Sequence, residues 1–311
     1  MIKYYKEQLE ISLIRRLQSN KLYGGSVFEN CSSNIDDYDL IYFYLDYFRL
    51  MHFGDQLFFK PLFKQLKYAG FPVLARPSKS IEFLFPNNEN IAYKEQKTLF
   101  ITTVHLLPHL KKLFGREIHY FLFDTASMSI DRSITNYFVD VFSDYFNLSH
   151  VLQPVSSGDF LDYLLPEKKK ILMSNNKYII FSNYLDSGRY RLFPKDKKLL
   201  LEKLKNNNSK STIVHIGSEN DKIKDSQNYS NITDIDLRGK TTIMDLFYLF
   251  STYSIEKIYC FDTIILHISN IFNHPANVVF RHFFKSGENE QKRNAYLSLY
   301  KKDTSMLSII N

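Results

Sequence analysis

The stretch KIYCFDTIILHISNIFNHPANVVF, residues 257–280, changes its hydrophobic period at Asp262. Residues 257–261 form a short run rich in β-formers, and from Thr263 onward the apolar residues recur at helical spacing. The pattern predicts a buried strand that passes directly into a helix. Asp262 and Thr263 are then either capping residues of that helix or part of a ligand site. Both interpretations are open, because helix N-termini attract anions and open α/β sheets bind ligands beyond the carboxyl ends of their strands.

Composition places the chain among folded proteins of about two ordinary domains. Its 311 residues are 44% hydrophobic and 16% aromatic, which is enough for two cores. The formal net charge of +7 favours an anionic partner such as a nucleotide phosphate, a phospholipid surface or a charged glycan. Nucleic acid is not expected, since the basic residues are scattered and match no nucleic-acid-binding motif. Cys31 and Cys260 offer neither metal-ligand spacing nor a disulfide framework, which favours a reducing compartment.

The N-terminal segment predicts a helix over residues 1–20 that docks on the protein, pairs with another subunit or lies on a membrane. Its first ten residues carry four charges at Lys3, Lys6, Glu7 and Glu10, so it does not resemble a signal peptide. No uninterrupted apolar stretch reaches the roughly 18 residues of a spanning helix. We therefore expect a soluble, cytoplasmic protein.

Strand and helix patterns alternate along the chain, which is typical of α/β domains with parallel sheets. Strands are predicted at residues 40–45, 72–75, 98–103, 118–123, 178–181, 212–216, 232–237 and 257–261. Helices are predicted at residues 57–67, 105–115, 133–146, 195–205 and 242–252, and again from residue 263. The alternation predicts two Rossmann-like halves.

A polar segment at residues 154–170 marks the expected boundary between the two halves. We predict a helical N-terminal extension at 1–39, with a polar connector at 24–38. The two Rossmann-like domains are then expected at 40–165 and 166–290. A C-terminal helical segment is expected at 291–311.

Small, polar and charged residues follow successive predicted strands of the second half. They are Ser182, Gly217 and Glu219, Arg238, and Asp262 with Thr263. In a parallel sheet these strand ends meet along one edge. Hydroxyls, backbone N–H groups and basic side chains can hold a diphosphate there, and Glu219 can accept hydrogen bonds from ribose hydroxyls. The sequence therefore predicts a nucleotide site at this edge.

Four motifs of the second half occur in the order found in glycosyltransferase family 9, the heptosyltransferase family of bacterial surface-glycan synthesis. They are SNYLDSGRYRLFPKDKKLLLEKL at 182–204, GSENDK at 217–222, IDLRGKTTIMDLF at 235–247 and DTIILHISNIFNHP at 262–275. In the first half, GDQLFFKPLFKQLK at 54–67 is similar to the turn and helix of the family's acceptor domain. The chain thus resembles this family over roughly residues 40–285, most clearly in the second half.

The resemblance implies a GT-B fold, in which two Rossmann-like domains face a cleft. It implies an inverting glycosyltransferase that needs no metal or other cofactor, with a nucleotide-sugar donor held by the second domain. ADP-heptose is the family's commonest donor, and another nucleotide sugar is the alternative. The implied acceptor is a hydroxyl of a bacterial surface glycan such as lipopolysaccharide or capsule. The implied location is the cytoplasm, with peripheral contact at the inner face of the cytoplasmic membrane.

The family's general base corresponds to Asp55, with His52 as the reserve base. The chemistry requires a carboxylate that can take the proton of the acceptor hydroxyl. A structural alternative is that Asp55 caps a helix beginning at Gln56. Both roles stay open at the level of sequence.

For the donor, the resemblance implies contacts from basic and helix-terminal residues. Arg189 and Arg191 flank the place of the family's phosphate-binding lysine, although exposed arginines often only face solvent. Asp262 and Thr263 would meet the donor sugar and phosphate. His267 lies one helical turn further on, where a purely structural histidine is the alternative.

Three departures from the family pattern bear on function. Ile264 replaces the glycine after Asp-Thr, Phe193 replaces the tryptophan before Pro194, and residues 51–53 replace a serine-rich lead. Ile264 and the loss of the serine-rich lead favour an alternative in which the chain is a non-catalytic nucleotide-sugar-binding or scaffold protein. The retained residues oppose that alternative, and they are Asp55, Glu219, Asp262 and His267. A nucleotide-sugar epimerase of related shape fits the motifs less well.

Overall fold

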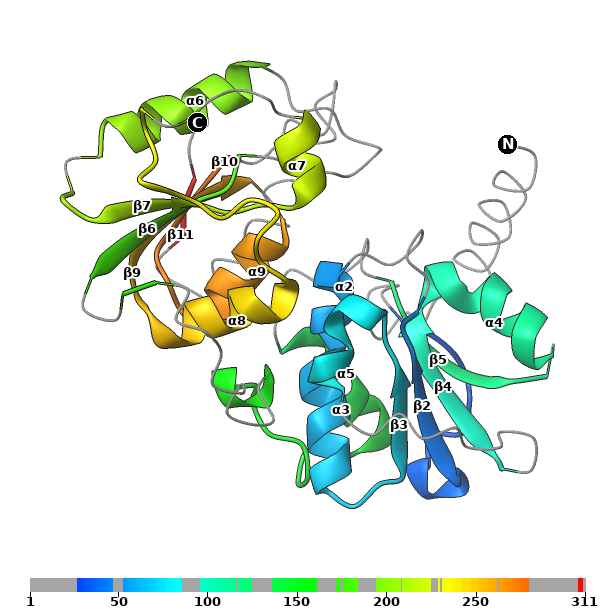
Figure 1. Cartoon of the computed structure of the whole chain (residues 1–311). Coiled ribbons are helices and arrows are strands. Elements are labelled where there is room, and N and C mark those ends of the chain that lie inside the picture. The colour runs from blue at the N-terminus through cyan, green and yellow to red at the C-terminus, as the bar shows by residue number, and fades with distance from the viewer. Residues whose placement is uncertain are drawn as a thin grey trace, which may run out of the picture. The chain divides into compact units, whose positions relative to one another are not determined.

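A computed structural model describes most of the two predicted halves. The described residues are 27–46, 53–85, 96–115, 117–124, 136–160, 172–173, 176–183, 194–207, 209–224, 229, 231–261, 263–279 and 307–309. The chain divides into two compact units, residues 1–162 and 163–311, each with its own sheet (Figure 1). The helix predicted over residues 1–20 lies outside the described residues.

The first unit contains a five-stranded sheet in the order β1-β5-β4-β2-β3. Its strands are β1 (Val27–Asn30), β2 (Leu40–Tyr44), β3 (Val73–Arg76), β4 (Thr98–Thr103) and β5 (His119–Phe123). Strands β2 to β5 run parallel, and β1 pairs antiparallel with β5. The chain moves from β2 outward to β3 and then returns to β4 on the other side. The topological switch point therefore lies between β2 and β4.

Helices cover both faces of this sheet, with α3 and α5 on one face and α4 on the other (Figure 1). The helices are α2 (Phe53–Leu57), α3 (Phe59–Tyr68), α4 (Leu107–Phe114) and α5 (Tyr137–Phe146). Short 3-10 helices are η2 (Ile35–Asp37), η3 (Lys79–Leu84), η5 (Val104–Leu106) and η7 (Ser157–Phe160). Successive side chains of β2 point to opposite faces of the sheet, so each face packs against a different layer of helices. The Phe43 ring lies 5.5 Å from Phe63 of α3, whereas the Tyr42 ring lies 6.3 Å from Phe114 of α4.

The second unit contains a six-stranded sheet in the order β11-β10-β9-β6-β7-β8, and every pair is parallel. Its strands are β6 (Lys177–Phe181), β7 (Thr212–His215), β8 (Ile235–Asp236), β9 (Ser254–Phe261), β10 (Ala276–Val279) and β11 (Leu307–Ile309). Counted from β6, this is the 3-2-1-4-5-6 order of dinucleotide-binding Rossmann folds. Its switch point lies between β6 and β9.

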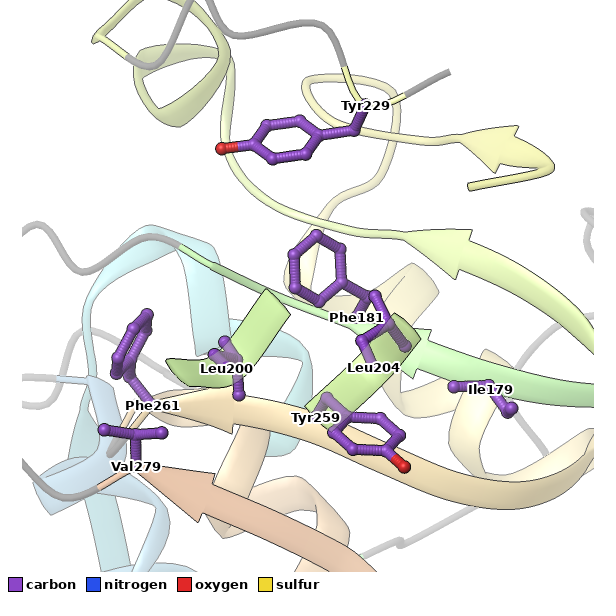
Figure 2. Packing of buried hydrophobic residues seen from close by; sticks show 8 residues of the cluster. All are labelled: Ile179, Phe181, Leu200, Leu204, Tyr229, Tyr259, Phe261 and Val279. Carbon is purple, nitrogen blue, oxygen red and sulfur yellow. The ribbon is translucent and has the colours of Figure 1, made fainter. Parts of the chain in front are cut away.

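Among the described helices, α6 and α7 cover one face of the second sheet, and α8 and α9 cover the other (Figure 1). They are α6 (Pro194–Lys205), α7 (Glu219–Lys224), α8 (Ile243–Thr252) and α9 (Ile264–Ile271). On the α6 face, Leu200 and Leu204 lie over Phe181 and Phe261 of the central strands (Figure 2). These four side chains are at most 1% exposed, so the leucine stripe of α6 anchors the helix to the sheet.

Several details differ from the sequence-based expectations. The strand predicted at 232–237 is limited to β8, and β10 was not predicted. The connector predicted at 24–38 contains β1, which extends the first sheet at its edge. The C-terminal segment predicted as helical contains β11, which pairs with β10. The helix predicted over 57–67 is divided at Phe58 into α2 and α3. Long-range strand pairing overrode the local pattern at β1 and β11.

Candidate functional site

The carboxyl edge of the second sheet brings together the described residues that directly follow β6, β7 and β8. Backbone hydrogen bonds continue past the strand ends, from Ser182 N to Tyr259 O at 2.9 Å and from Ile216 N to Phe181 O at 2.9 Å. A third runs from Leu237 N to His215 O at 2.8 Å. The residues that follow β6, β7 and β8 therefore leave the sheet side by side, next to the switch point where open α/β sheets bind ligands.

A buried polar pair lies directly behind this edge. His215, the last residue of β7, is fully buried, and its Nε2 lies 2.9 Å from Oδ1 of Asn183. The imidazole also contacts two aromatic rings, with centroids 4.6 Å from Phe181 and 5.0 Å from Tyr229. The sequence offers one weak signal for this pair, namely a polar residue in or just after each of two strands.

Arg238, predicted as a donor contact, is engaged within the protein. Its Nε donates to Asp236 Oδ1 at 3.0 Å and its Nη2 donates to Asp236 Oδ2 at 2.8 Å. The guanidinium also lies 5.4 Å from the centre of the Tyr229 ring. Hydrogen bonds from Arg238 lower the pKa of Asp236 to about 2. The pair fixes the loop after β8, and the charge of Arg238 is largely matched by Asp236.

Glu219 is the first residue of α7 and is exposed. A reciprocal pair of hydrogen bonds fixes the helix start. Asp221 N donates to Ser218 Oγ at 3.1 Å, and Ser218 N donates to Asp221 Oδ2 at 2.5 Å. Gly239 N donates to Gly217 O at 2.9 Å and ties the loop after β8 to the loop after β7. The predicted ribose contact Glu219 therefore lies on a well-anchored turn.

Helix α9 begins as the opening stretch predicted. Thr263 is its N-cap, and the hydroxyl oxygen accepts from Ile265 N at 3.3 Å. The capping interpretation thus holds for Thr263, and a capping hydroxyl can still donate its own proton to a ligand. Ile264, in the place of the family glycine, is half-buried. Loss of hydration lowers the pKa of His267 to about 4, so this imidazole is neutral at pH 7.

Asp55 lies in the first turn of α2, the short helix that follows β2 in the first unit. The alternative in which it caps a helix starting at Gln56 is wrong, because α2 begins at Phe53. Gln56 instead anchors α2 to the end of β3. Its Nε2 donates to Ser78 Oγ at 2.8 Å, and Ser78 N donates to its Oε1 at 3.1 Å. The half-buried Asp55 is therefore held beyond the carboxyl end of β2.

The remaining predicted site residues are His52, Arg189, Arg191 and Asp262, which lie outside the described residues. Within the described parts of the chain, no group of three or more His, Cys, Asp or Glu side chains is arranged to hold a metal ion. The same parts contain no helix long and apolar enough to cross a bilayer.

No protein-family model and no curated protein matches the sequence. Solved structures, in contrast, agree with this architecture. Among solved structures, the glycosyl transferase family 9 protein from Veillonella parvula superposes with a TM-score of 0.53 at 12% identity, covering 87% of this chain and 100% of its own. This chain therefore has the fold of a family 9 glycosyltransferase.

Another glycosyltransferase, TibC from enterotoxigenic E. coli, is also similar. Two structures of TibC, described as a dodecameric iron-containing glycosyltransferase and as a heptosyltransferase in complex with ADP-D-β-D-heptose, have TM-scores of 0.45. Their identities are 11% and 10%, and each match covers 78% of this chain and 58% of TibC.

Proposed function

We propose that this protein is a GT-B glycosyltransferase that moves a sugar from a nucleotide-sugar donor to a hydroxyl of a bacterial surface glycan. The observation that carries the proposal is the family 9 fold, which spans 87% of the chain. The second sheet gives further support, because it has the strand order of nucleotide-binding Rossmann folds and polar residues at its carboxyl edge.

The donor nucleotide binds at the carboxyl edge of the second sheet. Glu219 follows the second strand in the Rossmann order, where an acidic side chain accepts hydrogen bonds from ribose hydroxyls. Thr263 and the first N–H groups of α9 contact the diphosphate. The other donor contacts in this proposal are Ser182, Gly217, Arg189, Arg191, Arg238, Asp262 and His267.

Asp55 acts as general base in the transfer step, with His52 in reserve. It takes the proton of the acceptor hydroxyl, and the acceptor oxygen forms a bond to the anomeric carbon as the bond to the diphosphate oxygen breaks. Attack opposite the leaving group inverts the anomeric centre. Arg189, Arg191 and the α9 N-terminus stabilise the charge that develops on the leaving diphosphate, so no metal is required. Activity is accordingly expected to survive EDTA, and a strict requirement for Mg²⁺ or Mn²⁺ would contradict this mechanism.

The candidate substrates are nucleotide-sugar donors and bacterial glycan acceptors. ADP-heptose is the first donor candidate, followed by other nucleoside diphosphate sugars. The acceptors are lipopolysaccharide or capsule glycans, which the protein meets in the cytoplasm through peripheral contact with the inner membrane surface. The net charge of +7 suits such anionic substrates and surfaces.

A thermal-shift screen with ADP-, UDP-, GDP-, CMP- and dTDP-sugars tests donor binding, since a ligand bound only by the folded state raises the melting temperature. We expect one nucleotide class to raise it and Glu219→Gln to weaken that response. Incubation of the selected donor with a glycan extract should then release the free nucleotide. If no nucleotide sugar binds, the proposal is wrong.

A non-catalytic binding protein is the second candidate, and Ile264 is the observation that favours it. This side chain stands at the first position of α9, where glycine would let a ligand approach the backbone closely. Donor binding without nucleotide release, unchanged by Ile264→Gly, would support this candidate. Nucleotide release by the unaltered protein would exclude it.

A further inference from the structure

The turn after β8 is held against the loop after β7 in a conformation that requires glycine. Lys240 N donates to Leu237 O at 3.0 Å, which closes a four-residue turn, and Gly239 occupies its third position with φ +70°. A positive φ at this position favours glycine. The bond from Gly239 N to Gly217 O, at 2.9 Å, holds the two loops in contact.

The space beside Gly239 is occupied by the Glu219 carboxylate. A Cβ atom on Gly239 would lie 1.7 Å from Glu219 Oε2 and 2.9 Å from its Cδ. The same atom would lie 3.2 Å from the Glu219 Cα, so a rotation of the carboxylate alone would leave a tight backbone contact. The carboxylate thus rests directly on the backbone of the β8 turn, and any side chain at position 239 would displace it.

The backbone of Glu219 is fixed independently. The Ser218 and Asp221 hydrogen bonds set the start of α7, and Gly217 leaves room for them, since its Cβ would lie 2.9 Å from Asp221 Oδ2. With its backbone fixed, Glu219 can still rotate its side chain. Gly239 lies on one side of that side chain, and solvent is accessible to the exposed residue.

We infer that Gly239 is a positioning residue, which keeps the Glu219 carboxylate where it accepts hydrogen bonds from the vicinal 2′- and 3′-hydroxyls of a ribonucleotide. The inference rests on the proposed function. A site built to bond a hydroxyl discriminates against the analogue that lacks it. Gly239 therefore supports selection of ribonucleotide over 2′-deoxyribonucleotide donors, although it contacts neither hydroxyl itself.

Calorimetric titration with two nucleotide pairs tests the inference, namely ADP with 2′-deoxy-ADP and UDP with 2′-deoxy-UDP. The unaltered protein is expected to bind one ribonucleotide about ten- to a hundredfold more tightly than its deoxy analogue, the effect of one hydrogen bond to a charged group. Glu219→Ala and Gly239→Ala should each reduce this ratio to about one. The double variant should lose no more than the single variants, because both act on one contact.

Gly115→Ala is the matched control. Gly115 has φ +99°, and a Cβ atom added there would meet nothing within 4 Å, so alanine introduces similar backbone strain without a clash. This variant should lower the melting temperature yet keep the ribose preference. Glu219→Asp provides a further test that does not depend on the folding of Gly239→Ala, since the shorter acid withdraws the carboxylate from Gly239 and should also lose the preference.

The outcomes separate the two proposals. A ribose preference that persists in Gly239→Ala or in Glu219→Asp but is lost in Glu219→Ala overturns the positioning role and leaves the nucleotide site in place. A preference that persists in all variants overturns the contact between Glu219 and ribose, and the inference with it. Absence of binding to either nucleotide pair, together with a negative sugar-nucleotide screen, overturns the proposed function.

Discussion

The two units share a doubly wound, mainly parallel type of sheet but differ at their carboxyl edges. In the first unit, Thr102 Oγ1 donates to Tyr44 O at 2.5 Å, Gln56 and Ser78 form paired bonds, and Asp55 is half-buried. In the second unit, the edge carries an exposed Glu219 on a capped turn and the hydroxyl of Thr263. The sheet fixes where a site can form, and the edge residues decide its chemistry.

The cores differ as well. Aromatic rings dominate the α5 face of the first unit, where the Phe138 ring lies 4.5 Å from Phe123 and 4.6 Å from Phe59. On the α6 face of the second unit the core is mixed, because the aliphatic Leu200 and Leu204 of the helix pack with the aromatic Phe181 and Phe261 of the sheet (Figure 2). Under the proposed function, we expect Asp55 of the first unit to affect turnover, the aromatic cluster of that unit to affect stability, and Thr263 of the second unit to affect donor affinity.

The largest expected effect is on turnover. Asp55→Asn should reduce transfer by about 10²–10⁴, the usual contribution of a general base. Donor affinity should stay unchanged, because the carboxylate takes the acceptor proton and does not hold the nucleotide. Steady-state kinetics and calorimetry on the same preparation measure both quantities. Asp36→Asn, an exposed acid of η2 before the amino end of β2, is the control. Near-normal turnover of Asp55→Asn would make His52 the candidate base.

The next effect is on stability. Phe123→Ala removes a fully buried ring from the aromatic cluster and should lower the free energy of unfolding by about 3–5 kcal/mol. Urea denaturation followed by circular dichroism measures the change. Tyr68→Ala, at a side chain that is 75% exposed, should change stability by less than about 0.5 kcal/mol. Equal effects of the two variants would contradict the importance of this cluster.

A smaller effect distinguishes capping from ligand binding in the second unit. Thr263→Ala should cost about 0.5–2 kcal/mol of stability through loss of the N-cap. Thr242→Ala removes the capping box of α8 and should cost a similar amount. If Thr263 contacts the donor, Thr263→Ala should lower donor affinity, whereas Thr242→Ala should leave it unchanged. Equal donor affinity in the two variants would reduce Thr263 to a structural cap.

The last expected effect is a pH dependence of stability. The pKa of His267 is lowered from 6.5 to about 4, so the unfolded chain binds the proton more readily than the folded one between these values. Stability should therefore fall as the pH is lowered from about 6.5 to about 4. Thermal melts across this range should show a shallower decline for His267→Gln. An unchanged profile would mean that other groups cause the decline.

Much of the fold could be predicted from local patterns. The bounds predicted for β4, residues 98–103, are those of the structure, and the helix predicted from residue 195 corresponds to α6. The strand-to-helix change around Asp262 is likewise present, with Thr263 as the cap. Such features depend on hydrophobic period and capping chemistry within one segment, and these can be read from consecutive residues.

What only the tertiary structure decided depends on residues far apart in the sequence. The strand character of β1 comes from antiparallel pairing with β5, which no local pattern indicated. The engagement of Arg238 with Asp236 and the Tyr229 ring anchors the loop after β8, a role that the sequence did not indicate. Likewise, Glu219 meets Gly239 because β7 and β8 are neighbours in the sheet. The sequence by itself determined which polar residues follow the strands, whereas strand order and loop packing decided which of them touch, because those contacts form only when distant segments are brought together.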